Sequence, residues 1–213
     1  MADNYLERKF EEFRNGGPRK STARRSGASL DTLLLRNRSY RGYDKSHTVH
    51  MQDLKTIVAV NTRIPSARNQ QSLRFKLVTR ESGADRMLNL IRLGGALSEL
   101  HLPLPGTEPE AFIIICSTNA EYRWTGVDVG ISAQSMLLKA VEMGLGGICI
   151  GAFNKEKVIA EFGLDCEPML ILAIGKPAET IQLKPINASD DHDYYRKEGI
   201  HYVPKVIVDD LIM

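Results

Sequence analysis

The chain has 213 residues, 43% of them hydrophobic, which suffices for one compact domain with a substantial core and leaves little room for two. Its 28 Lys and Arg residues nearly balance its 26 Asp and Glu residues, so the net charge of +2 provides no global basic field for a nucleic acid or a membrane surface. No stretch approaches the roughly 20 consecutive apolar residues of a membrane span, and the N-terminus is charged where a signal peptide would be apolar. We therefore expect a cytoplasmic protein.

Residues 1–29 have the composition of an N-terminal extension. Residues 4–14 mix Leu and Phe with charges at helical spacing, and residues 15–29 have the Gly, Ser and Arg content of a linker. The basic residues of that linker have no interleaved aromatics, which favours a solvated segment over a nucleic-acid site. We expect either a helix that clasps a dimer or a tail, followed by one domain over residues 30–213.

Helices and strands are predicted to alternate through that domain. The first helix begins at Leu30, with Leu33 and Leu34 on the same face and Asp31 in the first turn. Further helices are expected over residues 51–61, 84–100, 127–143 and 155–162, and strands over residues 75–79, 111–116, 148–150 and 169–174. Residues 182–213 are polar and irregular in pattern, and we expect them to pack on another surface, such as a second subunit. The class is a mixed α/β or α+β domain with four or five strands.

The first candidate for chemistry is the segment Arg36–Arg41, placed where the first helix runs out. Guanidinium groups two or three residues apart, together with a hydroxyl, can converge on one phosphate, because Arg offers fork-shaped donors. The alternative is a solvated C-terminal turn whose arginines complement the helix dipole. The segment alone leaves both interpretations open.

The second candidate is the polar loop Ile64–Gln71, between a predicted helix and a predicted strand. Proline fixes its entry, small residues allow close approach to a planar ligand, and Asn and Gln side chains supply donors and acceptors for a ring such as a flavin pyrimidine. An ordinary connecting loop is equally compatible with this spacing.

The glycine-rich run Gly144–Phe153 has the wrong order for a dinucleotide-binding loop, because its glycines close a helix and enter a strand. What remains is Gly151, whose missing side chain would let a backbone N–H reach a ligand. The histidines and cysteines lack metal-site spacing, so we expect no metal, and His192 is expected in a solvated loop. Cys116 and Cys149 lie in strand-like runs and are predicted to be buried and unreactive.

Six segments, in this order, resemble the nitroreductase family of FMN-dependent oxidoreductases. Arg38–Tyr43 is similar to the RRSxRxF start, Pro65–Gln71 to PSxxNxQ, and Asp128–Gln134 to the DxGxAxQ opening of the central helix. The remaining matches are Gly144–Gly146 with Ile150–Phe153, Gly175–Ala178, and Tyr202–Lys205. The departures are Asn37 for the first Arg, Val206 and Ile207 where a second basic residue often follows, and Ser72-Leu73 for Pro-Trp.

The resemblance implies an α+β fold, a central mostly antiparallel sheet flanked by helices, and a domain-swapped homodimer with two FMN sites at its interface. The residues that it implies for the FMN phosphate and ribityl region are Arg38, Ser39, Arg41 and Lys205. Those that it implies for flavin contacts from the other subunit are Pro65, Ser66, Ala67, Asn69 and Gln71. The backbone of Gly151, with Ile150 and Ala152 beside it, would approach flavin N5.

The family's chemistry implies a ping-pong mechanism in which NADH or NADPH reduces FMN and a nitroaromatic, quinone or similar small oxidant then accepts the hydride. No protein nucleophile is needed, because the flavin carries the chemistry. Two alternatives stay open: a specialised member such as a reductive dehalogenase, and a flavin-binding sensor or store without turnover. The departures at Asn37, Val206 and Ile207 favour the sensor, because a weakened phosphate site can bind without efficient cycling.

Overall fold

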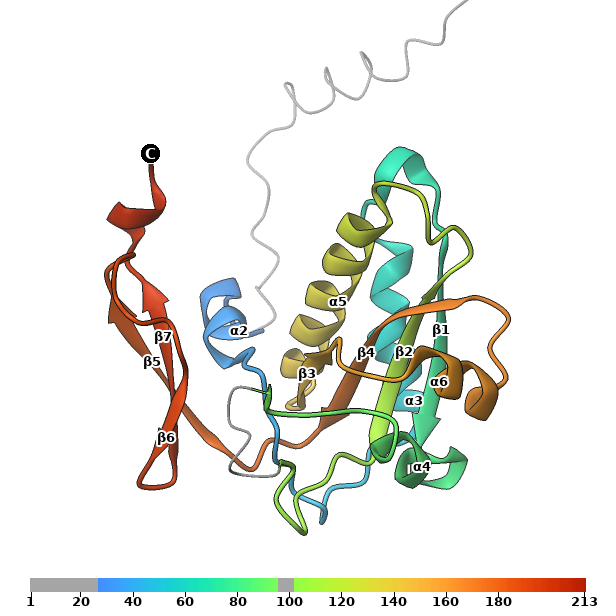
Figure 1. Cartoon of the computed structure of the whole chain (residues 1–213), viewed down its shortest axis with the longest axis horizontal. Coiled ribbons are helices and arrows are strands. Elements are labelled where there is room, and N and C mark those ends of the chain that lie inside the picture. Colours follow the sequence, from blue (N-terminus) through green and yellow to red (C-terminus); the bar gives the residue numbers. More distant parts are fainter. Residues whose placement is uncertain (1–26, 96–101) are drawn as a thin grey trace, which may run out of the picture.

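The computed structural model describes residues 27–95 and 102–213, and the predicted helix over residues 4–14 and most of the linker lie outside these ranges. Its centre is a four-stranded sheet in the order β1-β2-β4-β3, antiparallel throughout (Figure 1). The strands are β1 (Leu73–Thr79), β2 (Ala111–Ser117), β3 (Gly146–Ile150) and β4 (Glu167–Gly175). The four predicted strands are confirmed, as are the α+β class and the antiparallel central sheet.

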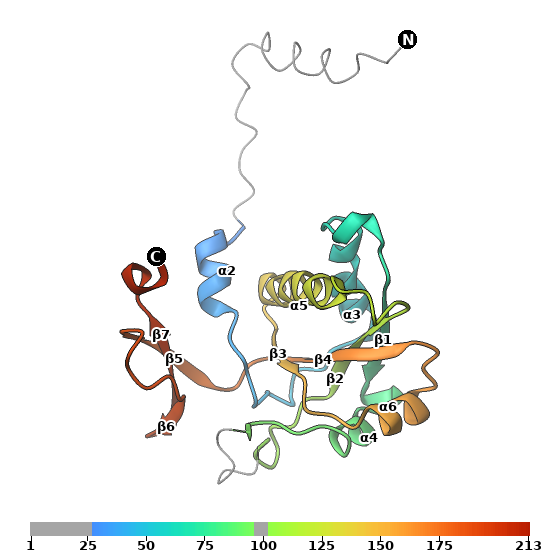
Figure 2. The ribbon, with the colours of Figure 1, turned by 45° about the horizontal axis from the view of Figure 1, so that its top comes forward.

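Two layers of helices cover the sheet because its central strands are apolar on both faces. All seven residues of β2 are buried. Ile113 and Ile115 pack with helices α3 (Met51–Val58) and α5 (Thr125–Glu142) in one core. Phe112 and Ile114 pack with α4 (Ala84–Leu88) and α6 (Lys155–Phe162) in another. Figure 2 shows these two helix pairs on opposite faces of the sheet.

The long helix α5 runs from one end of the domain to the other. Its buried positions recur every three or four residues, as one face of a helix requires. It ends where Gly144 adopts a φ of 78° and the Leu145 N–H donates to the Ala140 carbonyl at 2.8 Å. Eighteen residues at about 1.5 Å each make this helix roughly 27 Å long.

The predicted helix over residues 84–100 is wrong beyond Leu88, and residues 96–101 lie outside the described ranges. After Leu88 the chain forms a bridge between Ile91 and Phe153, with the Arg92 N–H donating to the Ala152 carbonyl at 2.9 Å. Gly94 follows with a φ of 69°, a conformation that ends a helix. Tertiary pairing and glycine therefore override the helical spacing.

The C-terminal region corrects a second expectation. Residues 182–213 are not irregular: with the residues just before them they form a second sheet, in the order β5-β7-β6. Strand β5 (Thr180–Ile186) pairs in parallel with β7 (Ile200–Val206), and β6 (Tyr195–Lys197) pairs antiparallel with β7. The described residues thus contain seven strands where four or five were expected. This sheet stands beside helix α2 (Leu30–Arg36), apart from the central sheet (Figure 1).

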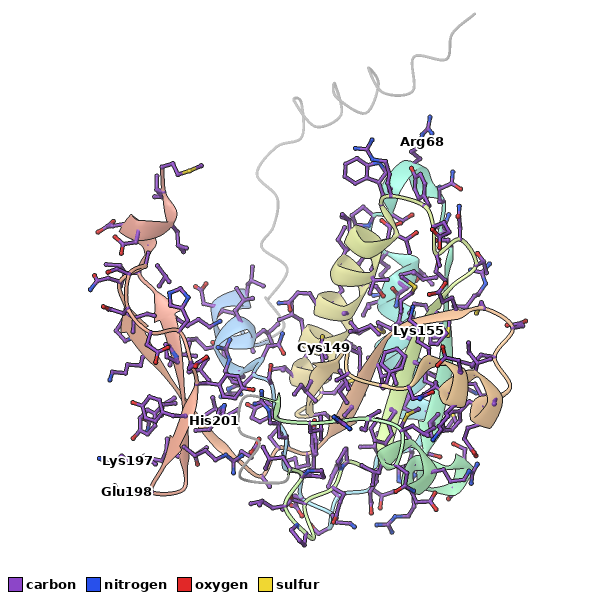
Figure 3. The ribbon with its side chains drawn as sticks, in the orientation of Figure 1. Arg68, Cys149, Lys155, Lys197, Glu198 and His201 are labelled. Atoms are coloured by element: carbon purple, nitrogen blue, oxygen red, sulfur yellow. The ribbon has the colours of Figure 1, made fainter. Side chains whose placement is uncertain are left out.

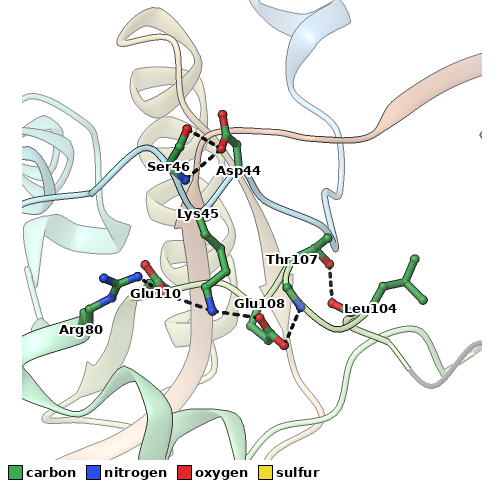
Figure 4. A network of polar contacts seen from close by, with 9 residues as sticks. Asp44, Lys45, Ser46, Arg80, Leu104, Thr107, Glu108 and Glu110 are labelled. Atoms are coloured by element: carbon green, nitrogen blue, oxygen red, sulfur yellow. Dashed lines mark hydrogen bonds and ion pairs between the residues drawn. The ribbon is translucent and has the colours of Figure 1, made fainter.

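A surface network ties three connections together at one edge of the domain (Figure 4). Lys45 donates to Glu108 at 3.1 Å and lies 3.4 Å from Glu110, which also pairs with Arg80. These side chains are partly exposed, so each pair contributes about 0–1 kcal/mol.

None of the described helices is both long and apolar enough to cross a membrane.

Candidate functional site

The segment after helix α2 is fixed against the edge of the central sheet. Asn37 ends the helix, and Ser39 forms a parallel bridge with Gly147 of β3. The Tyr40 N–H donates to the Gly147 carbonyl at 3.2 Å. A Cβ at Gly146 would lie 2.7 Å from the Tyr40 ring, so a glycine is needed for this close packing. The predicted phosphate-binding segment is therefore held by β3.

Arg41, from the same segment, is buried and held from several sides. Its backbone N–H donates to Oε2 of Glu179 at 2.6 Å. Its guanidinium Nη1 donates to the Ser39 carbonyl at 3.0 Å, and the group lies 4.7 Å from the centre of the Tyr194 ring. That distance and geometry allow a cation–π interaction.

The C-terminal sheet supplies the opposite wall. Successive side chains of a strand alternate between its faces, so His201, Val203 and Lys205 of β7 share one face. Ile181 of β5 is the register partner of His201 and joins them. This face meets the segment after α2.

Between these walls lies a cavity of about 210 Å³. The residues that line it are Asn37, Arg38, Ser39, Arg41, Ile181, Tyr194, His201, Val203 and Lys205. The structure thus brings together the four residues predicted for the phosphate and ribityl region, although Lys205 is more than 160 positions from the others. Asn37, where the family commonly has Arg, donates to Gln134 at 3.2 Å and adds no charge.

The cavity has an excess of positive charge. Within the part of the chain that the structure describes, no carboxylate forms an ion pair with Arg38, Arg41 or Lys205. Arg38 Nε and Arg41 Nε are buried without a hydrogen-bond partner among the described residues, and burial lowers the pKa of Arg38. The carboxylate of Glu179 pairs instead with Arg196. Buried guanidinium N–H groups without acceptors are costly, and an oxyanion in this cavity would satisfy them.

The loop predicted to contact the flavin has an unusual backbone. Arg68, Asn69 and Gln71 all adopt positive φ values near 50°, which is uncommon for residues other than glycine and costs free energy. The strain is offset locally: the Gln71 side chain donates to Asn69 Oδ1 at 3.1 Å, and the Ala67 N–H donates to Asp128 Oδ1 at 2.8 Å.

This loop presents its polar groups outward. Pro65, Asn69 and Gln71 are exposed, and Ser66 and Ala67 are half-buried. Pro65, Ser66 and Gln71 also border a cavity of about 610 Å³ between α3, β1 and the start of α5.

The loop and the cationic cavity lie at opposite ends of α5. Asp128, which anchors the loop, is in the first turn of the helix, whereas Gly147, which anchors Ser39, follows its C-terminus. Figure 3 shows Arg68 of the loop and His201 of the cavity far apart on the molecule. One chain therefore does not bring all the predicted site residues together.

Gly151 and its neighbours lie between the loop Pro65–Gln71 and the cationic cavity. Gly151 follows β3 by one residue and is four residues beyond Gly147, hence roughly 13 Å further along the chain. A Cβ at Gly151 would meet nothing within 4 Å, so open space lies over its backbone, and Ala152 is exposed beside it. The Ile150 side chain is buried in the core that contains α6, so only the backbone of Ile150 is available to a ligand.

Sequence reasoning missed three residues of the cavity wall, Ile181, Tyr194 and His201. The His201 side chain is 2% exposed, and its Nε2 lies 3.4 Å from Arg41 Nη1. Burial, helped by the nearby Arg41 and Arg196 charges, lowers the pKa of His201 to about 4. The alternation of His201, Val203 and Lys205 was a usable signal, but it requires the segment to be recognised as a strand.

The two cysteines predicted to be buried differ in their exposure. Cys116 is buried as predicted, and burial raises the pKa of its thiol to about 12. The prediction for Cys149 is wrong, because this residue is exposed. Its neighbours Ile148 and Ile150 point into the core on one face of the edge strand β3, so Cys149 points to the other face, where the described residues leave it accessible. His192 is exposed, as predicted.

The fold and the cavity define an α+β protein with a cationic site beside the edge of an antiparallel sheet. The model of the nitroreductase family matches residues 34–176, about two thirds of the chain. The chain belongs to the nitroreductase family. The match ends before β5, so the C-terminal sheet with His201 and Lys205 lies beyond it.

Solved structures share the fold at low sequence identity. A nitroreductase family protein from Streptococcus pneumoniae is 17% identical, with a TM-score of 0.59, and the match covers 72% of this chain and 93% of that one. A Clostridium difficile family member is 21% identical, with a TM-score of 0.57 and coverages of 71% and 86%. A point variant of an FMN- and NADPH-dependent nitroreductase from a Sphingopyxis strain is 20% identical, with a TM-score of 0.59 and coverages of 71% and 89%.

Proposed function

We propose that this protein is an FMN-dependent oxidoreductase that takes hydride from NADH or NADPH and passes it to a small oxidant such as a nitroaromatic or a quinone. The observation that carries the proposal is the cavity that gathers Arg38, Ser39, Arg41 and Lys205. Membership of the family and the FMN- and NADPH-dependence of a structural neighbour support it.

The cavity fits the phosphate end of FMN. Three cationic side chains without carboxylate partners among the described residues surround a space of about 210 Å³. A phosphate monoester offers oxygens to the fork-shaped guanidinium donors of Arg38 and Arg41 and to the ammonium of Lys205. Ser39 adds a hydroxyl donor at the exposed side.

The flavin ring would then extend along β3 toward Gly151. The open backbone beyond Ile150 lets a planar ring approach, and an N–H there would bond to flavin N5. When bound, FMN supplies the hydride chemistry itself. The protein's part is to hold the phosphate, to expose one face of the ring to its substrates and to limit water.

We propose a homodimer because the site is incomplete in one chain. The loop Pro65–Gln71 lies beyond the N-terminus of α5, and the cationic cavity lies beyond its C-terminus. A mononucleotide does not bridge a helix of roughly 27 Å. A second copy, placed with its loop over the first copy's flavin, would complete the contacts expected from Ser66, Asn69 and Gln71.

Exposed apolar side chains support the second copy. Leu30, Leu34 and Leu35 on α2 are between 40% and 64% exposed. Other exposed apolar positions are Trp124 and Val127 at the start of α5 and Val208, Leu211, Ile212 and Met213 at the C-terminus. Apolar surface of this extent on several elements is typical of an interface. We propose one FMN-binding unit over residues 30–213 within each subunit, preceded by the extension 1–29.

An absorption spectrum of the purified protein tests the proposal. We expect a yellow protein with a flavin band at roughly 450 nm that bleaches when NADH or NADPH is added without oxygen. A nitroaromatic or a quinone should restore the band. Bound flavin that neither nucleotide bleaches would contradict the oxidoreductase function, and a colourless protein that cannot be reconstituted with FMN would contradict the cofactor.

A further inference from the structure

The proposed phosphate site does not account for a buried histidine in its wall. His201 is 2% exposed and belongs to β7, outside the segment that the family model matches. We propose that His201 is a positioning residue: its imidazole, together with the Tyr194 ring, holds the Arg41 guanidinium in place for the phosphate. The inference rests on the proposed function and gives the C-terminal sheet, which already supplies Lys205, a second part in the phosphate site.

The geometry places three groups in mutual contact. Arg41 Nη1 lies 3.0 Å from the Ser39 carbonyl oxygen and 3.4 Å from His201 Nε2. The guanidinium carbon lies 4.7 Å from the Tyr194 ring centre. The Tyr194 and His201 rings are 5.2 Å apart and tilted by 52°. The guanidinium is thus restrained at one edge by two acceptors and on one face by an aromatic ring.

His201 can restrain Arg41 only as a neutral imidazole. Nε2 must keep its lone pair to accept from the guanidinium, which puts the proton on Nδ1. Protonation would add the second proton to Nε2, whose N–H would then face the Arg41 guanidinium instead of accepting from it. Nδ1 is buried without a partner among the described residues. The charged groups around the ring are Arg41 and Arg196, and Glu179 pairs with Arg196. Lys205 lies four residues further along β7 on the same face of the strand. Burial and both arginines lower the pKa of His201 and keep it neutral.

Freely rotating arginine side chains lose conformational entropy when they bind an anion, so a restrained guanidinium binds more tightly. The restraint acts on the phosphate contact and not on the flavin ring, because Gly151 and the loop Pro65–Gln71 lie elsewhere. Strand β7 therefore has two parts in the site: Lys205 contributes a charge, and His201 orients another.

The test compares FMN with riboflavin, which lacks the phosphate. The full-length protein is stripped of flavin and titrated with each compound, with flavin fluorescence as the readout. His201→Phe keeps a ring against Tyr194 but removes the acceptor, and we expect it to weaken FMN binding about tenfold while riboflavin binding stays unchanged. His201→Gln keeps an acceptor oxygen and should bind FMN within about twofold of the unchanged protein. His192→Phe, at an exposed histidine, is the matched control.

A double variant shows whether His201 acts through Arg41. In an Arg41→Gln background, His201→Phe should cause no further loss of FMN affinity, because the group that it positions is gone. Equal losses for FMN and riboflavin, no loss at all, or additive losses in the double variant would overturn the inference. If His201→Phe does not fold, His201→Met, which also lacks a nitrogen acceptor and adapts to the space, takes its place. An unchanged protein that binds neither flavin would instead contradict the proposed function.

Discussion

The central sheet and the C-terminal sheet of this protein are held by different forces. In the central sheet every residue of β2 is buried, and two apolar cores cover its faces. In the C-terminal sheet most of β5 is exposed, and the buried group is His201, which contacts Arg41. The first sheet is stabilised by apolar burial, whereas the second is attached through polar contacts at the candidate site. Changes in the two sheets should therefore have different consequences.

The largest effect is expected in the central sheet. Ile114→Ala removes a fully buried side chain between two helices and should lower the free energy of unfolding by about 3–4 kcal/mol. Leu183→Ala, at a 37% exposed position of β5, should cost less than about 1 kcal/mol. Urea denaturation followed by circular dichroism measures both. Equal losses would contradict the contrast between the sheets.

An intermediate effect is expected where the C-terminal sheet joins the domain. Glu179 accepts from the Arg41 backbone and pairs with Arg196, and both side chains of the pair are at most 20% exposed. Glu179→Gln leaves Arg196 without a counter-charge and should cost about 2–3 kcal/mol of unfolding free energy. Glu161→Gln, which breaks the exposed pair with Arg86, should cost at most about 1 kcal/mol. The prediction fails if the two variants unfold at the same urea concentration.

The third effect depends on pH. Burial lowers the pKa of His201 to about 4, below its unfolded value of 6.5, so the unfolded chain binds a proton that the folded chain does not. The folded state should therefore lose stability as pH falls from 6.5 to 4, by about 2–3 kcal/mol from this residue. His201→Gln cannot bind this proton. Its free energy of unfolding relative to that of the unchanged protein should therefore rise as the pH falls from 6.5 to 4. A difference that is constant between pH 7 and pH 4 would count against a neutral, buried His201.

The smallest effect on folding is expected at Gly151. Because a Cβ there meets nothing within 4 Å, Gly151→Ala should change the free energy of unfolding by about 0.5 kcal/mol or less. It should nevertheless weaken flavin binding, because the methyl group would occupy the space proposed for the ring. Gly147→Ala is the contrast, since its Cβ would lie 2.4 Å from the Ala173 carbonyl oxygen and should destabilise the fold. Unchanged flavin affinity in Gly151→Ala would argue against a ring over this backbone.

Much of the central domain could be predicted because its elements bury one face or two. The regular spacing of apolar residues in α5 and the continuous apolar run of β2 reflect this burial directly. The helix predicted after Leu88 failed where pairing with residues 152–154 replaced helical hydrogen bonds. That pairing is a tertiary interaction that local spacing does not contain.

The C-terminal sheet was missed for a physical reason as well. Strand β5 is mostly exposed, so it has no alternation of buried and polar residues. Pro185 lies inside β5 and Pro204 inside β7, and proline within a segment argues against a strand. Lys205 was found through the family resemblance, whereas Tyr194 and His201 required the fold. The candidate site was thus predictable where it follows family motifs and not where it depends on the second sheet.

The central claim is that two copies of the chain complete each flavin site, and complementation between two defective chains tests it most directly. One chain carries Arg38→Ala and Arg41→Ala in the cavity, and the other carries Asn69→Ala and Gln71→Ala in the loop. Each alone should bind little FMN. If the site is shared, the mixed dimer contains one site with an intact cavity and an intact loop, so purified mixed dimers from co-expression should bind FMN at one of their two sites. Mixed dimers that stay as colourless as the two parent proteins would show that cavity and loop must belong to the same chain, and would contradict the account.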